Sequence, residues 1–480
     1  MNSNGTRKGL ILILVCIAQF MVVLDIAIVN VALPAMQQDL GLRQSTLQWV
    51  VIAYGLFLGG FLLLGGRLGD LLGRRRIFLT GLTIFTVASL VAGLAQSAEV
   101  LIGARAVQGF GAALLAPSAL SILAVTFAEG RERNSALGIF GAVGGSSASV
   151  GVIASGLLTD GPGWRWIFFI NIPIGAVLIA LAARFLPFDM VDSGARRYDA
   201  AGAATVTGGL ILLVYGLNRG VDHGWGSART LALFASAGIL LAVFAWIESR
   251  AHSPLIPGAM LRNRTMVAAD LASFLLFGAF FSFIFLGSLL MQQLLAYSPT
   301  RTGVAWLATS LTAFVAAAIV GARLASTVGV KRLSITGFVL LTLSVGWLAR
   351  VPVGAEYPTD LLPAFLLAGI AIGLSAPTVQ IGALSGVSGS AVGLASGLVE
   401  TMREIGGAVG IAAVSTVLIT QTENAGRTEA FEGFRSAFMV IGVFAALGAL
   451  VAGFAFPSSP QAAGAPVDEG VVVTGVAPAD

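Results

Sequence analysis

The sequence predicts an all-α membrane protein with fourteen spans, and three observations support this fold class. Hydrophobic residues fill 57% of the 480 positions, charged residues fill only 10%, and the mean hydropathy is +0.93. This composition lies outside that of water-soluble domains. Apolar runs of about 20 residues, the length that crosses a bilayer, recur along the chain. Basic residues gather in the short segments between these runs.

The apolar runs define the expected spans, with twelve as the nearest alternative count. The first run, from Leu10, is too long for a signal-peptide core and has no cleavage site after it. If the N-terminus lies inside, the inner loops carry about twice as many basic residues as the outer loops. We therefore expect a multi-pass protein of the cell membrane, plasma or inner, with both termini in the cytoplasm. The expected spans lie near residues 10–33, 46–65, 77–96, 100–124, 137–159, 165–186, 200–217, 229–249, 266–291, 303–323, 333–350, 361–383, 394–418 and 436–456.

A glycine- and arginine-rich segment, Gly65–Arg76, separates the second and third runs and is expected to be a cytoplasmic loop. Its sequence, GGRLGDLLGRRR, places Asp70 among arginines and glycines. Glycines allow tight turns and close approach of helix ends. Asp70 is placed to cap the following helix, with Arg74 and Arg75 within reach. The alternative is an ordinary topogenic loop, for which basic residues suffice.

The same pattern recurs 256 residues later and indicates an internal repeat, with chance similarity of two short loops as the alternative. Parallel repeats of six spans would place a substrate site between two halves. The matches are Arg67 with Arg323, Leu68 with Leu324, Gly73 with Gly329 and Arg75 with Lys331, while Ser326 replaces Asp70. The expected parts are an N-terminal six-span bundle at 1–190, a two-span insertion with linkers at 191–260, a C-terminal six-span bundle at 261–456 and a disordered cytoplasmic tail at 457–480.

Charged side chains inside two spans of the first half are candidate coupling residues. Asp25 lies in the first span and Arg105 in the fourth, at similar distances from the outer side. Ionisable groups in a membrane are costly and usually line a pathway. We predict that Asp25 exchanges the coupled proton and that Arg105, which keeps its charge, tunes it. The alternatives are an Asp that fixes helix packing and a structural Arg–Asp pair.

Cargo binding or coupling is predicted at two further places. Gln108 follows Arg105 by three residues and shares its helix face. In the thirteenth span Glu400, Arg403 and Glu404 lie on one face, and a buried structural triad is the alternative there. Asp270 lies only a few residues inside the ninth span, so we favour an interfacial role for it.

Several of these segments resemble the major facilitator superfamily. Gly66–Arg75 resembles the loop between its second and third spans, and Leu101–Gly111 is similar to its R-x-x-Q-G pattern. Arg403–Ala408 resembles its R-x-x-G-G-A stretch. Gly163–Gly175, with the sequence GWRWIFFINIPIG, resembles the sixth-span entrance of the fourteen-span drug:proton antiporters. Gly151–Gly156 matches the antiporter signature G-P-x-x-G-G in part, with Val152 for the proline and Ser155 for the next-to-last glycine.

The resemblance covers about residues 10–456 and implies the major facilitator fold, with two six-helix bundles plus two inserted spans. It implies a secondary active transporter that exports amphipathic drugs or antibiotics in exchange for protons by alternating access. A metabolite facilitator or importer on the same fold is the alternative, because a fold does not fix a substrate. The resemblance assigns conformational gating to the loop residues Gly66, Asp70, Gly73, Arg74 and Arg75.

The sequence argues against other classes of function. His223 and His252 fall in loops on opposite sides, and neither a catalytic constellation nor a phosphate-binding Gly-Lys loop is present, so we expect neither an enzyme nor an ATP-driven pump. No cofactor, metal or nucleic acid is expected, and the single Cys16 excludes an intrachain disulfide. The expected partners are amphipathic cargo, protons and lipid, with a periplasmic adaptor if the host has an outer membrane. Six phenylalanines suit either aromatic cargo or lipid: Phe274, Phe277, Phe280, Phe281, Phe283 and Phe285.

Overall fold

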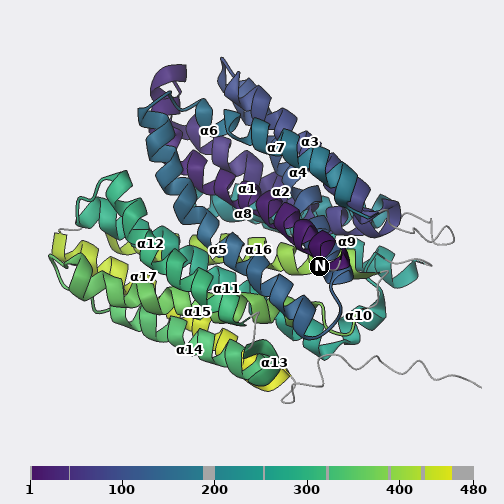
Figure 1. Ribbon diagram of the computed structural model, residues 1–480. Coiled ribbons are helices and arrows are strands. Elements are labelled where there is room, and N and C mark those ends of the chain that lie inside the picture. Colours follow the sequence, from purple (N-terminus) through teal and green to yellow (C-terminus); the bar gives the residue numbers. More distant parts are fainter. Residues whose placement is uncertain are drawn as a thin grey trace, which may run out of the picture.

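The computed structural model describes residues 3–42, 44–187, 200–251, 255–320, 324–387, 391–422 and 427–456, and these form helices joined by short connections (Figure 1). The predicted tail and part of the predicted linker fall outside this range. The helices are α1 (Ser3–Leu40), α2 (Gln44–Leu72), α3 (Arg74–Gly93), α4 (Ala98–Thr126), α5 (Arg131–Asp160), α6 (Trp166–Phe169), α7 (Asn171–Phe185), α8 (Ala200–His223), α9 (Ala228–Arg250), α10 (Gly258–Arg262), α11 (Arg264–Leu289), α12 (Pro299–Ile319), α13 (Ala325–Thr327), α14 (Val330–Leu348), α15 (Leu362–Ala383), α16 (Val392–Thr422) and α17 (Arg427–Ala455), with π-helical turns η1 (Leu290–Leu294) and η3 (Tyr357–Leu361).

The long helices follow the predicted spans. Thirteen stretches of the described residues are long and apolar enough to cross a membrane. The glycine- and serine-rich α5 is not among the thirteen, yet it has 30 residues and packs along α1 and α12. The structure is therefore an all-α membrane protein whose helices are consistent with fourteen spans, although the exact count rests on α5.

Equivalent glycines have equivalent places in the two halves. Gly73 and Gly329, 256 residues apart, precede α3 and α14 with φ angles of 99° and 90°. These angles are unfavourable for residues with a side chain. At the same offset, a Cβ built on Gly81 would lie 2.7 Å from the Gly111 carbonyl oxygen, and one built on Gly337 would lie 2.7 Å from that of Ala371. The spacing that marks the repeat in the sequence therefore has a structural counterpart.

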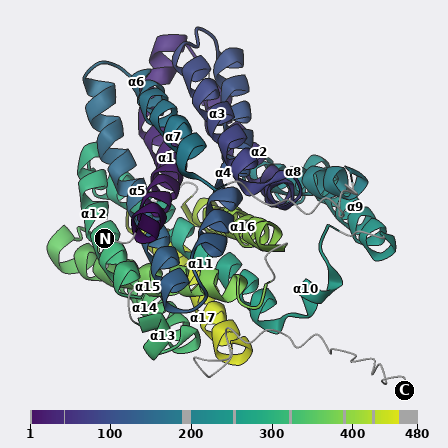
Figure 2. The same ribbon diagram turned by 45° about the vertical axis from the view of Figure 1, so that its right-hand side comes forward.

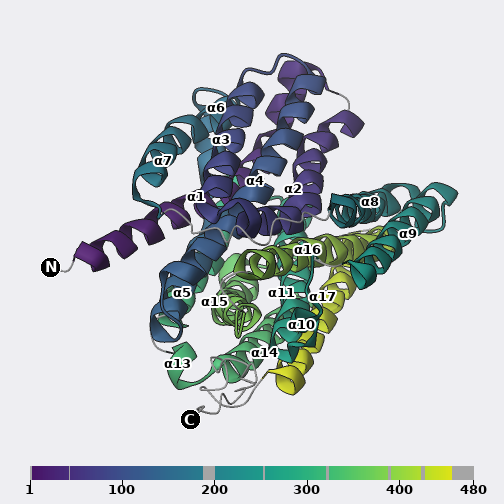
Figure 3. The same cartoon turned by 90° about the vertical axis from the view of Figure 1, so that its right-hand side faces the viewer.

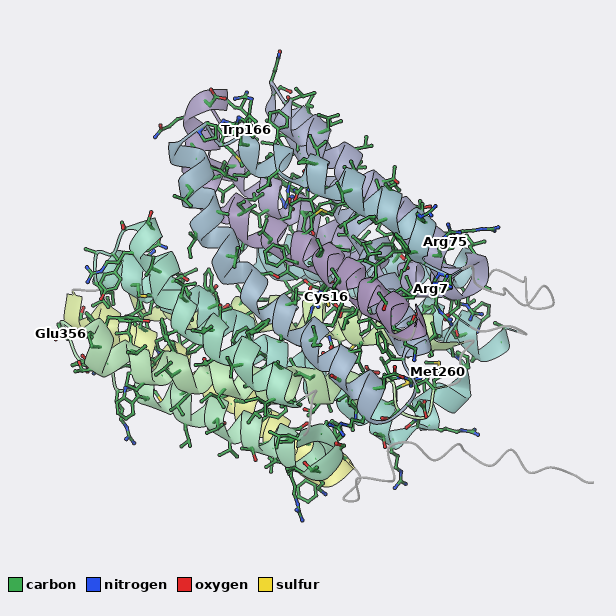
Figure 4. All side chains as sticks on the ribbon, in the orientation of Figure 1. Arg7, Cys16, Arg75, Trp166, Met260 and Glu356 are labelled. Atoms are coloured by element: carbon green, nitrogen blue, oxygen red, sulfur yellow. The ribbon has the colours of Figure 1, made fainter. Side chains whose placement is uncertain are left out.

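The N-terminal helices α1 to α7 and the C-terminal helices α11 to α17 adjoin through two helix pairs. α2 packs on α16, and α5 packs on α12, while α4 and α5 add contacts to α16 and α15. Figure 4 labels Arg7, Arg75 and Met260 at one end of the molecule, here called the Arg75 end. Trp166 and Glu356 lie at the other end, here called the Trp166 end. The two sets of helices diverge toward the Trp166 end (Figure 1).

The inserted pair α8 and α9 forms a hairpin beside the place where α2 meets α16 (Figures 2 and 3). A Cβ built on Gly60 of α2 would lie 2.4 Å from the Ile211 side chain, so α8 and α2 are in close contact. In the connection after α8, the Trp225 indole nitrogen donates a 2.7 Å hydrogen bond to the Thr416 hydroxyl of α16. The hairpin therefore contacts both halves of the protein.

The prediction that Gly65–Arg76 forms a loop is wrong. α2 continues through Leu72 and α3 starts at Arg74, so Gly73 alone separates the two helices. Glycines at positions 65, 66 and 69 lie inside α2 and allow close packing there. A Cβ on Gly66 would lie 2.3 Å from the Gly393 carbonyl oxygen of α16, so only glycine fits at this point.

At the Trp166 end, Asp39 of α1 is held by the residues that precede α6. Its Oδ2 accepts hydrogen bonds from an Arg165 guanidinium nitrogen at 2.5 Å and from the Trp164 indole nitrogen at 3.1 Å. The Arg165 and Trp164 hydrogen bonds lower the pKa of Asp39. The carboxylate therefore stays charged over the physiological pH range and joins the end of α1 to the start of α6.

Candidate functional site

The structure brings Asp25, Arg105 and Gln108 together inside the N-terminal half. The exposed fractions are 0% for Asp25, 1% for Arg105 and 0% for Gln108. One Arg105 guanidinium nitrogen donates to Asp25 Oδ2 at 2.5 Å and to Gln108 Oε1 at 2.7 Å. The Gln108 amide nitrogen donates to Asp25 Oδ1 at 2.9 Å. Each carboxylate oxygen of Asp25 therefore has a donor, as a buried charge requires.

Sequence reasoning missed three further members of this network, Ser89, Asn171 and Tyr54. The Asn171 amide nitrogen donates to Asp25 Oδ1 at 3.2 Å and to the Ser89 hydroxyl at 3.0 Å. The Tyr54 ring lies 4.2 Å from the Arg105 guanidinium carbon, in the position of a cation–π contact. Polar residues in otherwise apolar spans were the available signal, and Asn171 also falls in the family-specific string Gly163–Gly175.

Ser155 packs α5 against the same stretch of α1. Its hydroxyl donates to the Ile28 carbonyl oxygen at 2.6 Å, and it is 0% exposed. A Cβ on Gly151 would lie 3.0 Å from the Leu24 carbonyl oxygen, next to Asp25. The serine that departs from the antiporter signature thus fixes α5 to the helix that carries Asp25. The side chain of Val152 lies outside those that the structure describes.

A second charged cluster lies on α16. Arg403 forms ion pairs with Glu400 and with Glu404, the latter at 3.0 Å. Glu400 is 1% exposed, whereas the Glu404 side chain is 16% exposed. A Cβ on Gly59 of α2 would lie 3.9 Å from the Glu404 Cβ, so this cluster adjoins the N-terminal half. The three residues predicted on one helix face are therefore together in space.

Aromatic residues of α11 lie beside the α16 cluster. The Phe277 ring is 5.7 Å from the Arg403 guanidinium carbon and makes an edge contact with Phe281 at 5.5 Å. Phe283 instead packs with Trp306 and Phe365 in a buried group. Of the six phenylalanines named from the sequence, Phe280 and Phe283 are buried and the other four are partly buried.

Tyr54 lies between the two charged clusters. Its phenol interacts electrostatically with Asp25 and Arg105 of the N-terminal half, and with Arg403 and Glu404 of α16. The phenol hydroxyl donates a long 3.4 Å hydrogen bond to the Val22 carbonyl oxygen. Tyr54 therefore lies within electrostatic range of both clusters.

Asp70 caps a different helix from the one predicted. Its Oδ1 accepts the Gly393 backbone N–H at 2.9 Å and its Oδ2 accepts the Leu394 N–H at 2.8 Å, both at the start of α16. Arg74 pairs with Asp70 at 3.2 Å, and Arg75 donates to the Ala183 carbonyl oxygen at the end of α7. The carboxylate thus joins the two halves at the Arg75 end, instead of capping α3.

Asp270 has no ion pair with either cluster among the described residues. Its side chain is 6% exposed, and the interfacial role predicted for it stays a prediction. Gln108, expected to contact cargo or to couple, is enclosed with Asp25 and Arg105 and not with the α16 cluster. The candidate residues therefore form three separate groups, namely the Asp25 network, the α16 cluster and the Asp70 contact.

Two repeated sets of membrane helices, each with a buried ion-paired cluster, define a polytopic helical membrane transporter. Comparison with known families agrees, because the family description Major Facilitator Superfamily matches residues 15–411 and again 269–478. The chain therefore belongs to the Major Facilitator Superfamily.

Several named relatives resemble most of the chain. A puromycin resistance protein of Streptomyces alboniger is 39% identical over 412 residues, which cover 85% of this chain and 81% of that protein. A cephamycin export protein of Amycolatopsis lactamdurans is 37% identical over 435 residues, 90% of this chain and 89% of that protein. A tetracenomycin C resistance and export protein of Streptomyces glaucescens is 32% identical over 414 residues, 85% of this chain and 76% of that protein.

Solved structures share the fold. The human organic anion transporter MFSD10 superposes with a TM-score of 0.63 at 17% identity, over 91% of this chain and 99% of that one. The proton:xylose symporter XylE superposes with a TM-score of 0.63 at 13% identity, over 93% of this chain and 95% of that one. At these identities the likeness concerns the fold alone.

Proposed function

We propose that this protein exports amphipathic drugs or antibiotics in exchange for protons by alternating access, and that it carries out no covalent chemistry. Relatives named for puromycin resistance, cephamycin export and tetracenomycin C export support the direction and the class of cargo. The observation that carries the proposal is the acidic cluster of α16, which adjoins the opposite half of the protein beside an aromatic side chain.

The α16 cluster favours cationic, aromatic cargo. Two carboxylates and one guanidinium leave a net charge of −1 when both acids are ionised. Glu404 is the more exposed acid, and it faces α2 across the boundary between the halves. The Phe277 ring lies beside Arg403, where its face or edge can contact an aromatic cargo. A cation with an aromatic ring would gain a charge partner and a stacking partner at this place.

The Asp25 network is the proposed proton-exchange site. Arg105 keeps its charge at all physiological pH values, so Asp25 is the member able to gain and lose a proton. Gln108 and Asn171 hold the carboxylate in place in the conformation described here. A movement that separates Arg105 from Asp25 would favour protonation of the acid, because a nearby positive charge favours the carboxylate.

The Asp70 contact is the proposed gate. Two backbone hydrogen bonds and the close approach of Gly66 to Gly393 hold α2 and α16 together at the Arg75 end. The excess of basic residues in the predicted inner loops supports a cytoplasmic position for this end. In this proposal the described conformation is closed toward the cytoplasm, and the contact must break before cargo enters.

Proteoliposome assays of two single variants test this assignment. Asp25→Asn keeps the shape and one acceptor oxygen of the side chain but cannot titrate, so we expect it to lose uphill export of ethidium or puromycin while retaining binding of the compound. Glu404→Gln is expected to keep proton coupling and to weaken transport of cationic ethidium relative to a neutral compound. The measurements are proton release and cargo movement across a range of pH.

Two results would contradict the assignment. Uphill export by the Asp25→Asn protein would remove Asp25 from coupling, and loss of coupling in Glu404→Gln would move that role to α16. A metabolite importer on the same fold predicts the opposite direction of cargo movement in inverted vesicles. Uptake of antibiotic into such vesicles under an imposed proton gradient therefore distinguishes the exporter from the importer.

A further inference from the structure

Asp270 is a buried acid without an ion pair to any described residue. Among the residues that the structure describes, the acids classed as buried are Asp25, Asp270 and Glu400. Asp25 pairs with Arg105, and Glu400 pairs with Arg403. Asp270 is 6% exposed, and its fully buried Oδ1 has no hydrogen-bond donor in the described part of the chain. Asp270 is therefore the exception among the buried acids.

The surrounding helices enclose this part of α11 with apolar and neutral groups. Ala269 lies 3.1 Å from a Cβ built on Gly382 of α15, and the Ser273 hydroxyl donates to the Val399 carbonyl oxygen of α16 at 3.3 Å. Both contacts are within one turn of Asp270. The helix is therefore packed against α15 and α16 on either side of this residue in the sequence.

The charged groups of the adjoining described elements lie on α10, α11, α16 and α17. α11 packs against α10, α15, α16, α17 and η1, of which α15 and η1 contain no charged residue. Arg262 of α10 and Arg264 of α11 are exposed, and the α16 charges pair with one another. On α17, Arg435 donates to the Val351 carbonyl oxygen, and Glu429 and Glu432 would only add negative charge. None of these described groups forms an ion pair with Asp270.

A carboxylate in such surroundings is unfavourable. Removing an ionised carboxyl group from water costs several kcal/mol unless a cation or several donors compensate it. Such a group takes up a proton instead, because the neutral acid loses far less solvation. Asp25 and Glu400 differ because a guanidinium stabilises each carboxylate. The packing of α11 therefore selects Asp270 as the acid that holds a proton.

We propose that Asp270, on α11 in the C-terminal half, is a second proton-binding site. It holds a proton in the described conformation and releases it when water reaches α11 as the two halves rearrange. Its role in transport rests on the proposed proton exchange, whereas its protonation in this conformation does not. The two statements can therefore fail independently.

Infrared spectroscopy of the full-length protein in lipid tests protonation directly. A protonated carboxyl group has a carbonyl stretching band that a carboxylate lacks. We expect the wild-type spectrum at neutral pH to contain such a band, sensitive to ¹³C-labelled aspartate, and Asp270→Asn to lose it. Asp360→Asn is the matched control, because Asp360 is a surface acid that caps the Glu356 backbone N–H. If the band is equal in wild type and Asp270→Asn, the proposal is overturned.

A second variant and a transport assay complete the test. Asp270→Glu keeps a titratable group and should shift the carbonyl band. This variant provides the same information if Asp270→Asn does not fold. An unshifted band would then overturn the proposal. In proteoliposomes, Asp270→Asn should lose at least half of the proton movement per ethidium exported. Unchanged proton movement would overturn the transport role. Failure of the wild type to couple ethidium to protons would contradict the proposed function, while the infrared band would still decide the state of Asp270.

Discussion

Asp70 contributes a single carboxylate that accepts two backbone N–H groups from the opposite half of the protein. Charged acceptors bind backbone donors more strongly than neutral ones do. The same carboxylate also neutralises part of the charge of Arg74. A residue that the sequence placed in a loop is therefore the polar link between α2 and α16.

Replacement of Asp70 by Asn tests this link. A carboxamide has one acceptor oxygen and turns its NH₂ group toward the other N–H donor, so we expect the contact to weaken by about 1–3 kcal/mol. Transport of ethidium should fall about tenfold or more, because about 1.4 kcal/mol changes an equilibrium tenfold. Insertion, measured as the amount of folded protein in membranes, should stay unchanged, and Asp360→Asn serves as control. Transport at the parental rate would leave Asp70 with a topogenic role only.

Part of the residue chemistry could be predicted from the sequence. Equal depth in two spans predicted that Asp25 and Arg105 would meet, and three-residue spacing predicted that Gln108 would join them; the structure confirms their proximity. Asn171 and Ser89 could not be assigned, because spacing inside one span does not reveal which faces of different helices meet. Their roles in transport stay predictions.

At the scale of the elements, the spans could be predicted and their ends could not. Apolar runs identify helices because a bilayer demands about 20 apolar residues and an internally bonded backbone. The charges and glycines of Gly65–Arg76, between two apolar runs, predict a loop. In the structure its glycines allow helix α2 to approach α4 and α16. Composition alone does not distinguish a turn from a close helix contact.

The contacts of the α8–α9 hairpin also could not be predicted from the sequence. Nothing in its composition indicates that α8 packs on α2, or that Trp225 reaches α16. Trp225 also stacks on Phe234 of α9, with ring centroids 6.1 Å apart. The Trp225 indole therefore contacts α9 within the hairpin and α16 in the C-terminal half.

We predict that the Trp225–Thr416 hydrogen bond stabilises the attachment of the hairpin. Trp225→Phe keeps an aromatic ring on Phe234 but removes the N–H donor, and Thr416→Val removes the acceptor. Each variant should lower the stability of the purified protein by about 1 kcal/mol. Because both remove the same bond, the double variant should lose less than the sum of the two. Thermal unfolding in detergent gives the comparison, and strictly additive losses would show that the bond contributes nothing.

At the scale of the whole molecule, the structure confirms the helical fold, the match to the Major Facilitator Superfamily confirms the family, and the orientation in the membrane stays a prediction. Single-cysteine labelling tests that orientation. Cys16 is buried and is the single native cysteine, so Cys16→Ala provides the background. With fourteen spans, Gly226→Cys and Glu356→Cys should react with a membrane-impermeant thiol reagent added to intact cells.

Exposed positions at the opposite end provide the control for this labelling. Arg131→Cys and Arg262→Cys should react only after the membrane is opened. Gly226 lies between α8 and α9, so its labelling reports specifically on the inserted pair. Protection of Gly226→Cys together with labelling of Arg262→Cys from outside would contradict the fourteen-span arrangement.

The position of the α8–α9 hairpin also bears on where a transported molecule goes. α8 covers the side on which α2 meets α16. On the other side α5 packs on the C-terminal half along its length, with Gly141 near Pro377 of α15 and Gly156 beside Thr300 of α12. A compound held between the halves in this conformation would meet helices in both lateral directions. If the proposed export holds, its exit would run lengthwise past Trp166 and Glu356 into water (Figure 4), and not sideways into the lipid leaflet, from which an apolar compound can diffuse back into the cell.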